Sequence, residues 1–197
     1  MIKTIAFDFG GVLYTYNHSK LMSDVSGELN LPVELVSKAW KKGIIKFENG
    51  EISEEQFWQI FLNELEKKYD PKKLHEIVIN HHQPIKGSLG VLEKLKGKVS
   101  LGLVSNQTDW IDDLDQKYHF KELFDMVIVS KEVFLRKPDK KIFQLLIGRS
   151  TAKANEIVFV DDSLEYGQVV KDVGLKFIHF RNPDQLESDL RKLNVIF

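Results

Sequence analysis

Short apolar segments alternate with amphipathic ones along most of the chain. Each short segment is rich in β-branched and aromatic residues and ends at polar or glycine residues, a pattern typical of strands. Nearly continuous apolar strands are typical of a parallel sheet that is covered on both faces. The predicted strands are residues 2–7, 99–104, 126–129, 157–160 and 176–180.

Helical periodicity fills the gaps between these strands from residue 88 onward. Apolar residues recur at helical spacing in residues 89–95, 142–146 and 169–173. Pro138 suits the first position of the second of these helices, and Gly174 suits the end of the third. The alternation of strands and helices predicts an α/β fold with a doubly wound parallel sheet, a Rossmann-like core.

Residues 15–84 differ, because they show helical periodicity and no convincing strand. Asn30 and Ser53 are N-cap candidates, and Ser53 is followed by Gln56 as in a capping box. The aromatic residues recur at helical spacing, which favours the buried core of a bundle. We therefore predict an inserted four-helix cap domain at 15–84 and an α/β core domain at 1–14 and 85–197.

The composition excludes several classes of function. In 197 residues, 28 Lys and Arg balance 29 Asp and Glu, which gives a net charge of −1. This balance offers no basic surface for nucleic acid or an anionic membrane, and no apolar run is long enough to span a bilayer. The absence of cysteine excludes disulfides, thiolate metal sites and cysteine nucleophiles. The N-terminus lacks the features of a signal peptide. We therefore expect a cytoplasmic protein without a nucleic-acid or membrane partner. As a separate expectation, we take it to be a monomer or weak homodimer.

Polar side chains follow the predicted strands at the point where each strand ends. They carry carboxylate, hydroxyl or amide groups and are Asp8, Ser105, Asn106, Asp161 and Asp162. The carboxyl ends of parallel strands meet at one edge of an open sheet, where ligands bind. Lys137 precedes a predicted helix on the same side. We therefore expect all of these residues to converge at one site.

The chemistry of this set favours a metal ion and a phosphate. Two carboxylates about 4 Å apart repel by about 4 kcal/mol at an effective dielectric constant of about 20, and a divalent cation such as Mg²⁺ removes that cost. Lys137, Ser105 and Asn106 beside the metal would bind phosphate, together with backbone N–H groups in the turn from Phe9 to Gly11. Asp8 is then a carboxylate nucleophile of the kind that forms an aspartyl-phosphate.

These motifs, in this order, resemble those of the haloacid dehalogenase-like superfamily, whose members are mostly phosphatases. The four motifs are IAFDFGGVL, LVSN, FLRKPDKKIF and VFVDDS. The helical segment after the first motif resembles the C1 cap of the family. GEISEEQFW resembles a segment of the epoxide-hydrolase-type phosphatase branch. The resemblance implies a Mg²⁺-dependent phosphatase of a small phosphorylated metabolite.

The resemblance also implies a role for each site residue. Asp8 and Lys137 would be catalytic. The substrate would be bound by Ser105, Asn106 and Gly11. The metal would be ligated by Asp8, the backbone carbonyl of Gly10 and Asp162, with Asp161 acting through water.

One departure from the family pattern is Gly10. The family usually has a second Asp at this position, which serves as general acid and base. General acid catalysis contributes about 10² to 10⁴ in rate. Three explanations stay open: a substrate with a good leaving group, a substitute acid such as Glu51, His18 or Asp109, or a protein that binds phosphorylated ligands and turns them over poorly.

Two other classes of function remain as alternatives. The first is a phospholigand-binding or regulatory protein, which Gly10 favours. The second is a 2-haloacid dehalogenase, but that branch works without a metal and is expected to lack the acidic pair Asp161 and Asp162. A phosphomutase is disfavoured because it needs an acid at position 10. His81 and His82 resemble a metal-binding pair, but adjacent helical residues point apart, so we expect them at the surface.

Overall fold

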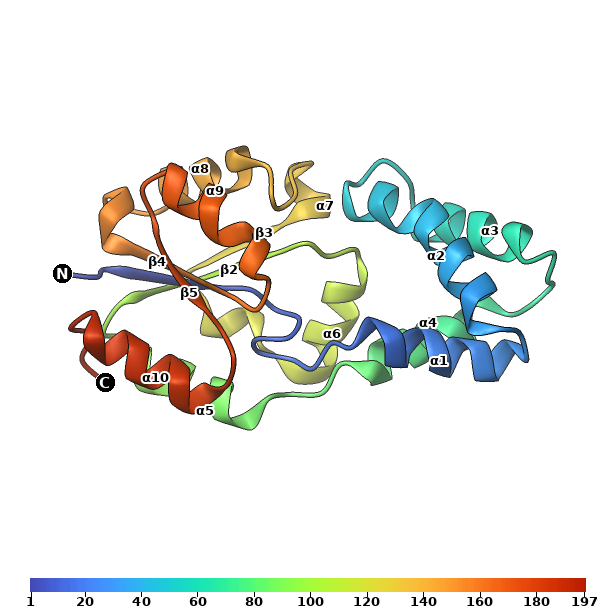
Figure 1. Cartoon of the computed structure of the whole chain (residues 1–197), viewed down its shortest axis with the longest axis horizontal. Helices are drawn as coiled ribbons and strands as arrows, with labels where there is room; N and C mark the ends of the chain where they lie inside the picture. The colour runs from blue at the N-terminus through green and yellow to red at the C-terminus, as the bar shows by residue number, and fades with distance from the viewer.

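A sheet of five parallel strands forms the centre of the computed structural model, which describes residues 1–197. The strands are β1 (Thr4–Phe7), β2 (Ser100–Ser105), β3 (Met126–Val129), β4 (Ile157–Asp161) and β5 (Lys176–His179). Their order in the sheet is β3-β2-β1-β4-β5, so the strand order reverses between β1 and β4 (Figure 1). Such a reversal marks the ligand-binding crevice of open α/β sheets.

Helices cover both faces of the sheet (Figure 1). One face is covered by α5 (Lys86–Leu95), α6 (Trp110–Tyr118) and α10 (Pro183–Lys192), and the other by α7 (Ser130–Val133), α8 (Lys140–Arg149) and α9 (Gly167–Asp172). Short 3₁₀ segments lie at Lys121–Leu123, Ala154–Glu156 and Leu164–Tyr166. Each face has its own buried hydrophobic cluster, with Leu92 and Leu186 on one side and Phe143 and Val170 on the other. The predicted doubly wound α/β fold is therefore confirmed.

Four helices inserted between β1 and α5 form what we call the cap. They are α1 (His18–Leu29), α2 (Val33–Glu48), α3 (Glu54–Glu64) and α4 (Pro71–His81). The cap lies beyond the carboxyl ends of the strands (Figure 1) and has a buried cluster of its own. Trp40 packs edge-on against Phe57 and Phe61 in this cluster, and Trp110 of α6 inserts into it from the core. The aromatic stripe thus forms the core of the cap, as its spacing predicts.

The ends of the cap helices match the prediction at Ser53 and differ from it at Asn30. Ser53 begins α3 with both hydrogen bonds of a capping box, to and from Gln56. Asn30 ends α1 instead of beginning α2, which starts at Val33. Its backbone is left-handed, with φ of 50°. Asn adopts this conformation more readily than most residues, so the same residue type suits either end of a helix.

The start of α8 also differs from the prediction. Pro138 lies before the helix, which begins at Lys140. Asp139 is the N-cap, because its carboxylate accepts a hydrogen bond of 2.9 Å from the N–H of Lys141. The loop that carries Lys137 is therefore two residues longer than expected.

All of the helices are short. The longest, α2, has 16 residues. A membrane-spanning helix needs about 20 mostly apolar residues, and none of these helices has the length and the apolar character to cross a bilayer.

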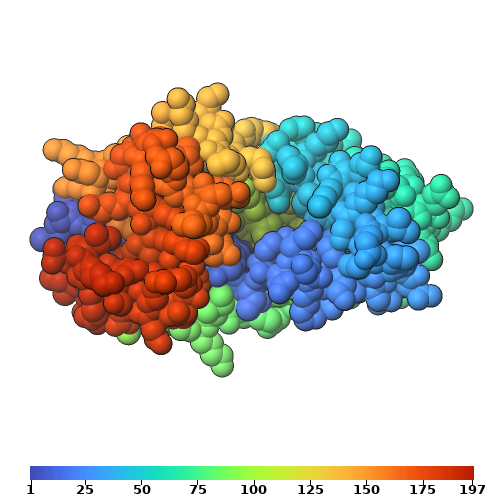
Figure 2. Space-filling model, viewed as in Figure 1, coloured from blue at the N-terminus to red at the C-terminus, as the bar shows by residue number.

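The cap and the core are joined along one side of a cleft by two neighbouring linkers. The Thr15 N–H donates to the Gln83 carbonyl at 2.8 Å, and the Gln83 N–H donates to Thr15 Oγ1 at 3.0 Å. Across the cleft, the end of α2 contacts the core, where the Ser130 hydroxyl donates to the Glu48 carbonyl at 2.6 Å. Figure 2 shows the hollow between the cap, in blue to cyan, and the core, in gold to red.

Candidate active site

Three carboxylates meet where β1 and β4 end. Asp8 directly follows β1, Asp161 is the last residue of β4, and Asp162 comes next. The pairing of β1 with β4 places Phe7 beside Val160, which brings the following residues to the same edge. One oxygen of each carboxylate lies within 4.8 Å of the others. The structure therefore brings together the acidic residues that the sequence separates by about three quarters of the chain.

Lys137 is buried between two of these carboxylates. Its Nζ lies 2.8 Å from Asp8 Oδ1 and 2.6 Å from Asp161 Oδ2. The rings of Phe159 and Tyr166 each lie 5.2 Å from the ammonium, within cation–π range. Burial acts to lower the pKa of Lys137, but the Asp8 and Asp161 charges outweigh it, so the pKa lies above its usual value. Lys137 is a permanent cation at the centre of the site.

Asn106 fixes the backbone of Lys137. Asn106 Oδ1 accepts from the Lys137 N–H at 2.7 Å, and Asn106 Nδ2 donates to the Lys137 carbonyl at 2.9 Å. The two backbone partners define which side-chain atom is oxygen and which is nitrogen. One N–H of the amide remains for a ligand. Asn106 is thus foremost a positioning residue for Lys137, a role that the sequence analysis did not assign.

Asp161 and Asp162 differ in what they can bind. Both oxygens of Asp161 are engaged, one by Lys137 and the other by the N–H of Ser163 at 2.8 Å. Asp162 lines the cavity, and the other residues of the protein leave its carboxylate free. A Cβ at Gly11 would lie only 2.3 Å from Asp162 Oδ2, so glycine is required for the close approach of that carboxylate. Asp162 is the better placed of the pair for direct contact with a metal.

The charges of the site fit a divalent cation. Burial, and then the charge of Asp8, raise the pKa of Asp161 to about 7 and raise that of Asp162 above its usual value. When all three carboxylates are ionised, one ammonium leaves an excess of two negative charges. Carboxylate and carbonyl oxygens are the ligands that Mg²⁺ prefers. The residues present therefore fit a Mg²⁺ ion at the edge of the sheet.

The turn after Asp8 differs from the prediction at Gly11. The Gly11 N–H donates to the Tyr14 carbonyl at 2.7 Å, so it is not free to bind substrate. This hydrogen bond occupies the N–H group that a substrate contact by Gly11 would use, and the role of Gly11 stays a prediction. The N–H groups of Phe9 and Gly10 have no acceptor within the protein. These two groups, directly after Asp8, are the ones available to an anion.

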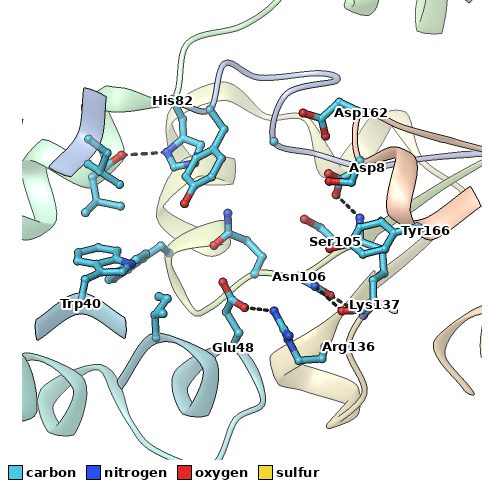
Figure 3. Close-up of a pocket in the computed structure, with 18 residues that line it drawn as sticks. Asp8, Trp40, Glu48, His82, Ser105, Asn106, Arg136, Lys137, Asp162 and Tyr166 are labelled. Carbon is cyan, nitrogen blue, oxygen red and sulfur yellow. Dashed lines mark hydrogen bonds and ion pairs between the residues drawn. The ribbon is translucent and has the colours of Figure 1, made fainter. Parts of the chain in front are cut away.

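A cavity of about 240 Å³ opens from the carboxylates toward the cap (Figure 3). At the sheet end it is lined by Asp8, Gly10, Ser105, Asn106, Lys137, Asp162, Ser163 and Tyr166. At the cap end it is lined by Tyr16, Leu21, Trp40, Ile44, Glu48, Val78, His82, Gln107, Trp110 and Arg136. The cavity therefore combines an ionic end with a largely apolar end.

Glu48 and Arg136 form an ion pair across the cleft, which the sequence analysis missed. Arg136 Nη2 lies 2.8 Å from Glu48 Oε2, so the pair links the end of α2 to the loop that holds Lys137 (Figure 3). Burial raises the pKa of Glu48 more than Arg136 lowers it. Arg136 could have been identified as a site residue because it precedes Lys137 in the sequence. The sequence around Glu48 contains no pattern that would identify it.

The histidine pair departs from the prediction. His82 is only 2% exposed and lines the cavity, not the surface. It follows the last residue of α4, where the backbone becomes extended, so helical geometry does not control its direction. Its ring stacks on Tyr16 with centroids 5.7 Å apart, while His81 Nε2 accepts from the Asn17 N–H at 3.1 Å. The two rings are therefore hydrogen-bonded to different groups.

None of the three suggested substitute acids lines the cavity. Asp109 is paired with Lys131, and Glu51 and His18 lie outside the lining. The space beside Gly10 is occupied by Tyr16, since a Cβ at position 10 would lie 3.2 Å from Tyr16 Cβ. Tyr16 therefore occupies part of the space that a side chain at position 10 would need.

The chain is similar in sequence to known hydrolases. The family model of the haloacid dehalogenase-like hydrolases matches residues 2–168. The chain is 26% identical to bifunctional epoxide hydrolase 2 of Sus scrofa over 98% of its own length but 39% of that protein. It is 25% identical to a sesquiterpene phosphatase of Aspergillus oryzae, covering 97% of this chain and 96% of the relative.

A solved structure shares the fold. It is a haloacid dehalogenase-like (HAD) family enzyme from Bacteroides thetaiotaomicron in complex with magnesium and inorganic phosphate. The TM-score is 0.79 at 21% identity, with 92% of this chain and 96% of that chain covered.

Proposed function

The chain belongs to the haloacid dehalogenase-like hydrolases, and from this we propose that it is a Mg²⁺-dependent phosphatase of small phosphorylated metabolites. The observation that carries the proposal is the Lys137 ammonium, held 2.8 Å from Asp8 and 2.6 Å from Asp161. It provides a fixed positive charge beside Asp8. A carboxylate nucleophile and a phosphate monoester are both anionic, so the reaction needs such a charge to bring them together.

In the proposed mechanism, Asp8 is the nucleophile. One of its carboxylate oxygens attacks phosphorus, and the bond from phosphorus to the leaving oxygen breaks. The departing alkoxide takes a proton from solvent and leaves as the alcohol. Water then attacks the phosphorus of the aspartyl-phosphate and gives up a proton to solvent, and the break of the bond from phosphorus to the Asp8 oxygen releases inorganic phosphate and restores the Asp8 carboxylate.

The surrounding residues hold the phosphoryl group during both steps. The Ser105 hydroxyl and the free N–H groups of Phe9 and Gly10 donate hydrogen bonds to its oxygens. Asp8, Asp162 and the Gly10 carbonyl would hold Mg²⁺, which when bound supplies positive charge to the phosphoryl oxygens. Asp161 positions the Lys137 ammonium, and Asn106 positions its backbone.

The relatives support the choice of reaction within the family. One curated relative is described as a phosphatase, and the structural neighbour was crystallised with magnesium and inorganic phosphate. The acidic pair at the end of β4 also favours a metal-dependent phosphatase over a metal-free dehalogenase. The apolar end of the cavity is compatible with a leaving group that is not a sugar.

Removal of Mg²⁺ tests the proposal. We expect p-nitrophenyl phosphate to be hydrolysed with Mg²⁺, not with EDTA, and again after Mg²⁺ is restored. A ligand that binds only the folded state stabilises it by about 2.7 kcal/mol at 100 times its Kd. Mg²⁺ should therefore raise the Tm of the wild type, and the variant Asp162→Asn should lose this increase. Asp172→Asn, at the exposed end of α9, is the matched control and should keep it.

Gly10→Asp tests the missing general acid. The new carboxyl group can protonate a poor leaving group, so the substitution should raise kcat for butyl phosphate. The fold-increase for butyl phosphate should exceed that for p-nitrophenyl phosphate by at least about tenfold. Tyr16 occupies part of the required space, so the gain should be larger in combination with Tyr16→Ala. Equal effects on both substrates would contradict the view that an acid is missing here.

A second candidate is a phospholigand-binding protein with little turnover, which the absence of an acid at position 10 favours. It shares the Mg²⁺ and phosphate contacts but not the chemistry. Stabilisation by Mg²⁺ and phosphate without hydrolysis of any aryl phosphate would select this candidate over the phosphatase.

A further inference from the structure

His82 presents a buried nitrogen that has no partner in the protein. The residue is 2% exposed, and its Nε2 is within hydrogen-bond distance of no protein group. His82 lines the same cavity as Asp8, on the side of the cap (Figure 3). A buried acceptor without a partner is unfavourable. A buried nitrogen without a partner, in a residue that lines the cavity, points to a ligand group that binds it.

The hydrogen bonds of the ring define what that group must be. His82 Nδ1 lies 2.9 Å from the Val78 carbonyl, which can only accept, so Nδ1 carries the proton. Burial lowers the pKa of His82 to about 4, so the ring is neutral at neutral pH. A neutral ring protonated at Nδ1 has an unprotonated Nε2. That atom is an acceptor and needs a donor on the ligand.

The surroundings of His82 restrict the rest of the ligand. The apolar residues along this end of the cavity include Leu21, Trp40 and Val78, and Tyr16 and Gln107 add polar groups. The charged groups at this end, Glu48 and Arg136, are paired with each other. The cavity of about 240 Å³ is smaller than the range of about 300–1,000 Å³ typical of drug-sized ligands. A small and mostly apolar leaving group fits these walls.

We propose that His82 Nε2 accepts a hydrogen bond from a hydroxyl or amine on the leaving group, and so selects small, largely apolar phosphate monoesters that carry one such donor. This inference rests on the proposed phosphatase function. His82 is then a specificity-determining residue that acts at the cap end of the cavity, while the chemistry takes place at Asp8.

A matched substrate series tests the donor. The series is butyl phosphate, its 2-, 3- and 4-hydroxybutyl analogues, and their methyl ethers, which keep the oxygen and lose the donor. We expect at least one hydroxybutyl phosphate to exceed butyl phosphate in kcat/KM by about 10- to 100-fold. Its methyl ether should show no such gain. A gain for the ether equal to that for the alcohol would overturn the proposal.

Two substitutions of His82 separate its two nitrogens. In His82→Asn the side-chain amide can still donate to Val78 but does not reach the place of Nε2, whereas in His82→Gln it reaches that place with an acceptor oxygen. The ratio of kcat/KM for the hydroxybutyl and butyl phosphates should fall to about 1 in His82→Asn and be partly kept in His82→Gln, relative to the wild-type gain. Because each enzyme is its own reference, a general loss of activity does not affect the ratio. An unchanged ratio in His82→Asn would overturn the proposal while leaving the phosphatase function intact.

A binding measurement gives a result even without turnover. In the Asp8→Asn variant with Mg²⁺, ¹⁵N NMR of the histidine rings should show Nε2 of His82 unprotonated, and the preferred hydroxybutyl phosphate should shift this signal. Butyl phosphate should shift it much less, and loss of the signal in His82→Asn assigns it. Equal shifts with both ligands, or a protonated Nε2, would refute the role of His82. Absence of aryl phosphate hydrolysis by the wild type would instead refute the phosphatase function.

Discussion

Asp8→Asn is expected to reduce kcat for p-nitrophenyl phosphate by at least about 10⁴-fold, the scale seen when an enzyme loses its nucleophile. The amide has nearly the same shape as the carboxylate but does not attack phosphorus. The fold should persist, because Lys137 keeps its contact of 2.6 Å with Asp161. Steady-state kinetics and thermal unfolding on the same preparations measure both effects.

A covalent intermediate gives the same prediction a second readout. Rapid quenching of the wild type during turnover should show one added phosphoryl group on the peptide that contains Asp8, and Asp8→Asn should show none. Asp184→Asn, in the first turn of α10 and outside the cavity lining, is the matched control and should retain full activity. Hydrolysis by Asp8→Asn at more than about one hundredth of the wild-type rate would rule out Asp8 as the nucleophile.

Lys137→Met should have the largest effect on stability. The ammonium is buried between two carboxylates, and removal of one partner from a buried ion pair costs about 3–5 kcal/mol, since it leaves uncompensated charge. Urea unfolding should show a lower midpoint without a change in slope. Activity should be lost as well, because no other cation of the protein lies beside Asp8.

The response to Mg²⁺ distinguishes the charge of Lys137 from its packing. Without the ammonium, the three carboxylates have a larger excess of negative charge, so Mg²⁺ should stabilise Lys137→Met more than it stabilises the wild type. Lys140→Met, at the exposed start of α8, should change stability by less than about 0.5 kcal/mol. An equal Mg²⁺ response in Lys137→Met and the wild type would contradict the electrostatic account.

The fold class and the convergence of the polar residues could be predicted because they follow from strand order. Apolar runs that end in polar residues predict parallel strands, and parallel strands bring their carboxyl ends to one edge. That argument alone places Asp8 near Asp161, Asp162 and Ser105, although they are far apart in the chain. It needs no knowledge of side-chain contacts.

The features that the sequence did not predict depend on such contacts. The N–H of Gly11 is engaged by Tyr14, a pairing that only the turn geometry determines. His82 is buried because the chain leaves α4 at that residue and turns toward the core. Asn30 can begin or end a helix, and the local pattern does not distinguish the two. Each of these depends on the exact residue at which an element ends.

The domain boundaries predicted at 14/15 and 84/85 remain a prediction. The structure gives the cap a hydrophobic cluster of its own, yet Trp110 of the core belongs to it. Trp110 Nε1 also donates to Glu54 of the cap at 2.8 Å. This contact joins the core to the cap. The hydrophobic periodicity of the two segments does not predict it.

The two linkers beside the cleft constrain how the cap can move. Tyr14 and Pro84 are bridged, so both chain crossings lie on one side. Two adjacent tethers restrain rotation of the cap about the line through them less than they restrain sliding or twisting. On the opposite side Glu48 meets Ser130 and Arg136, so such a rotation must break these contacts, together with those that Trp110 makes in the cap.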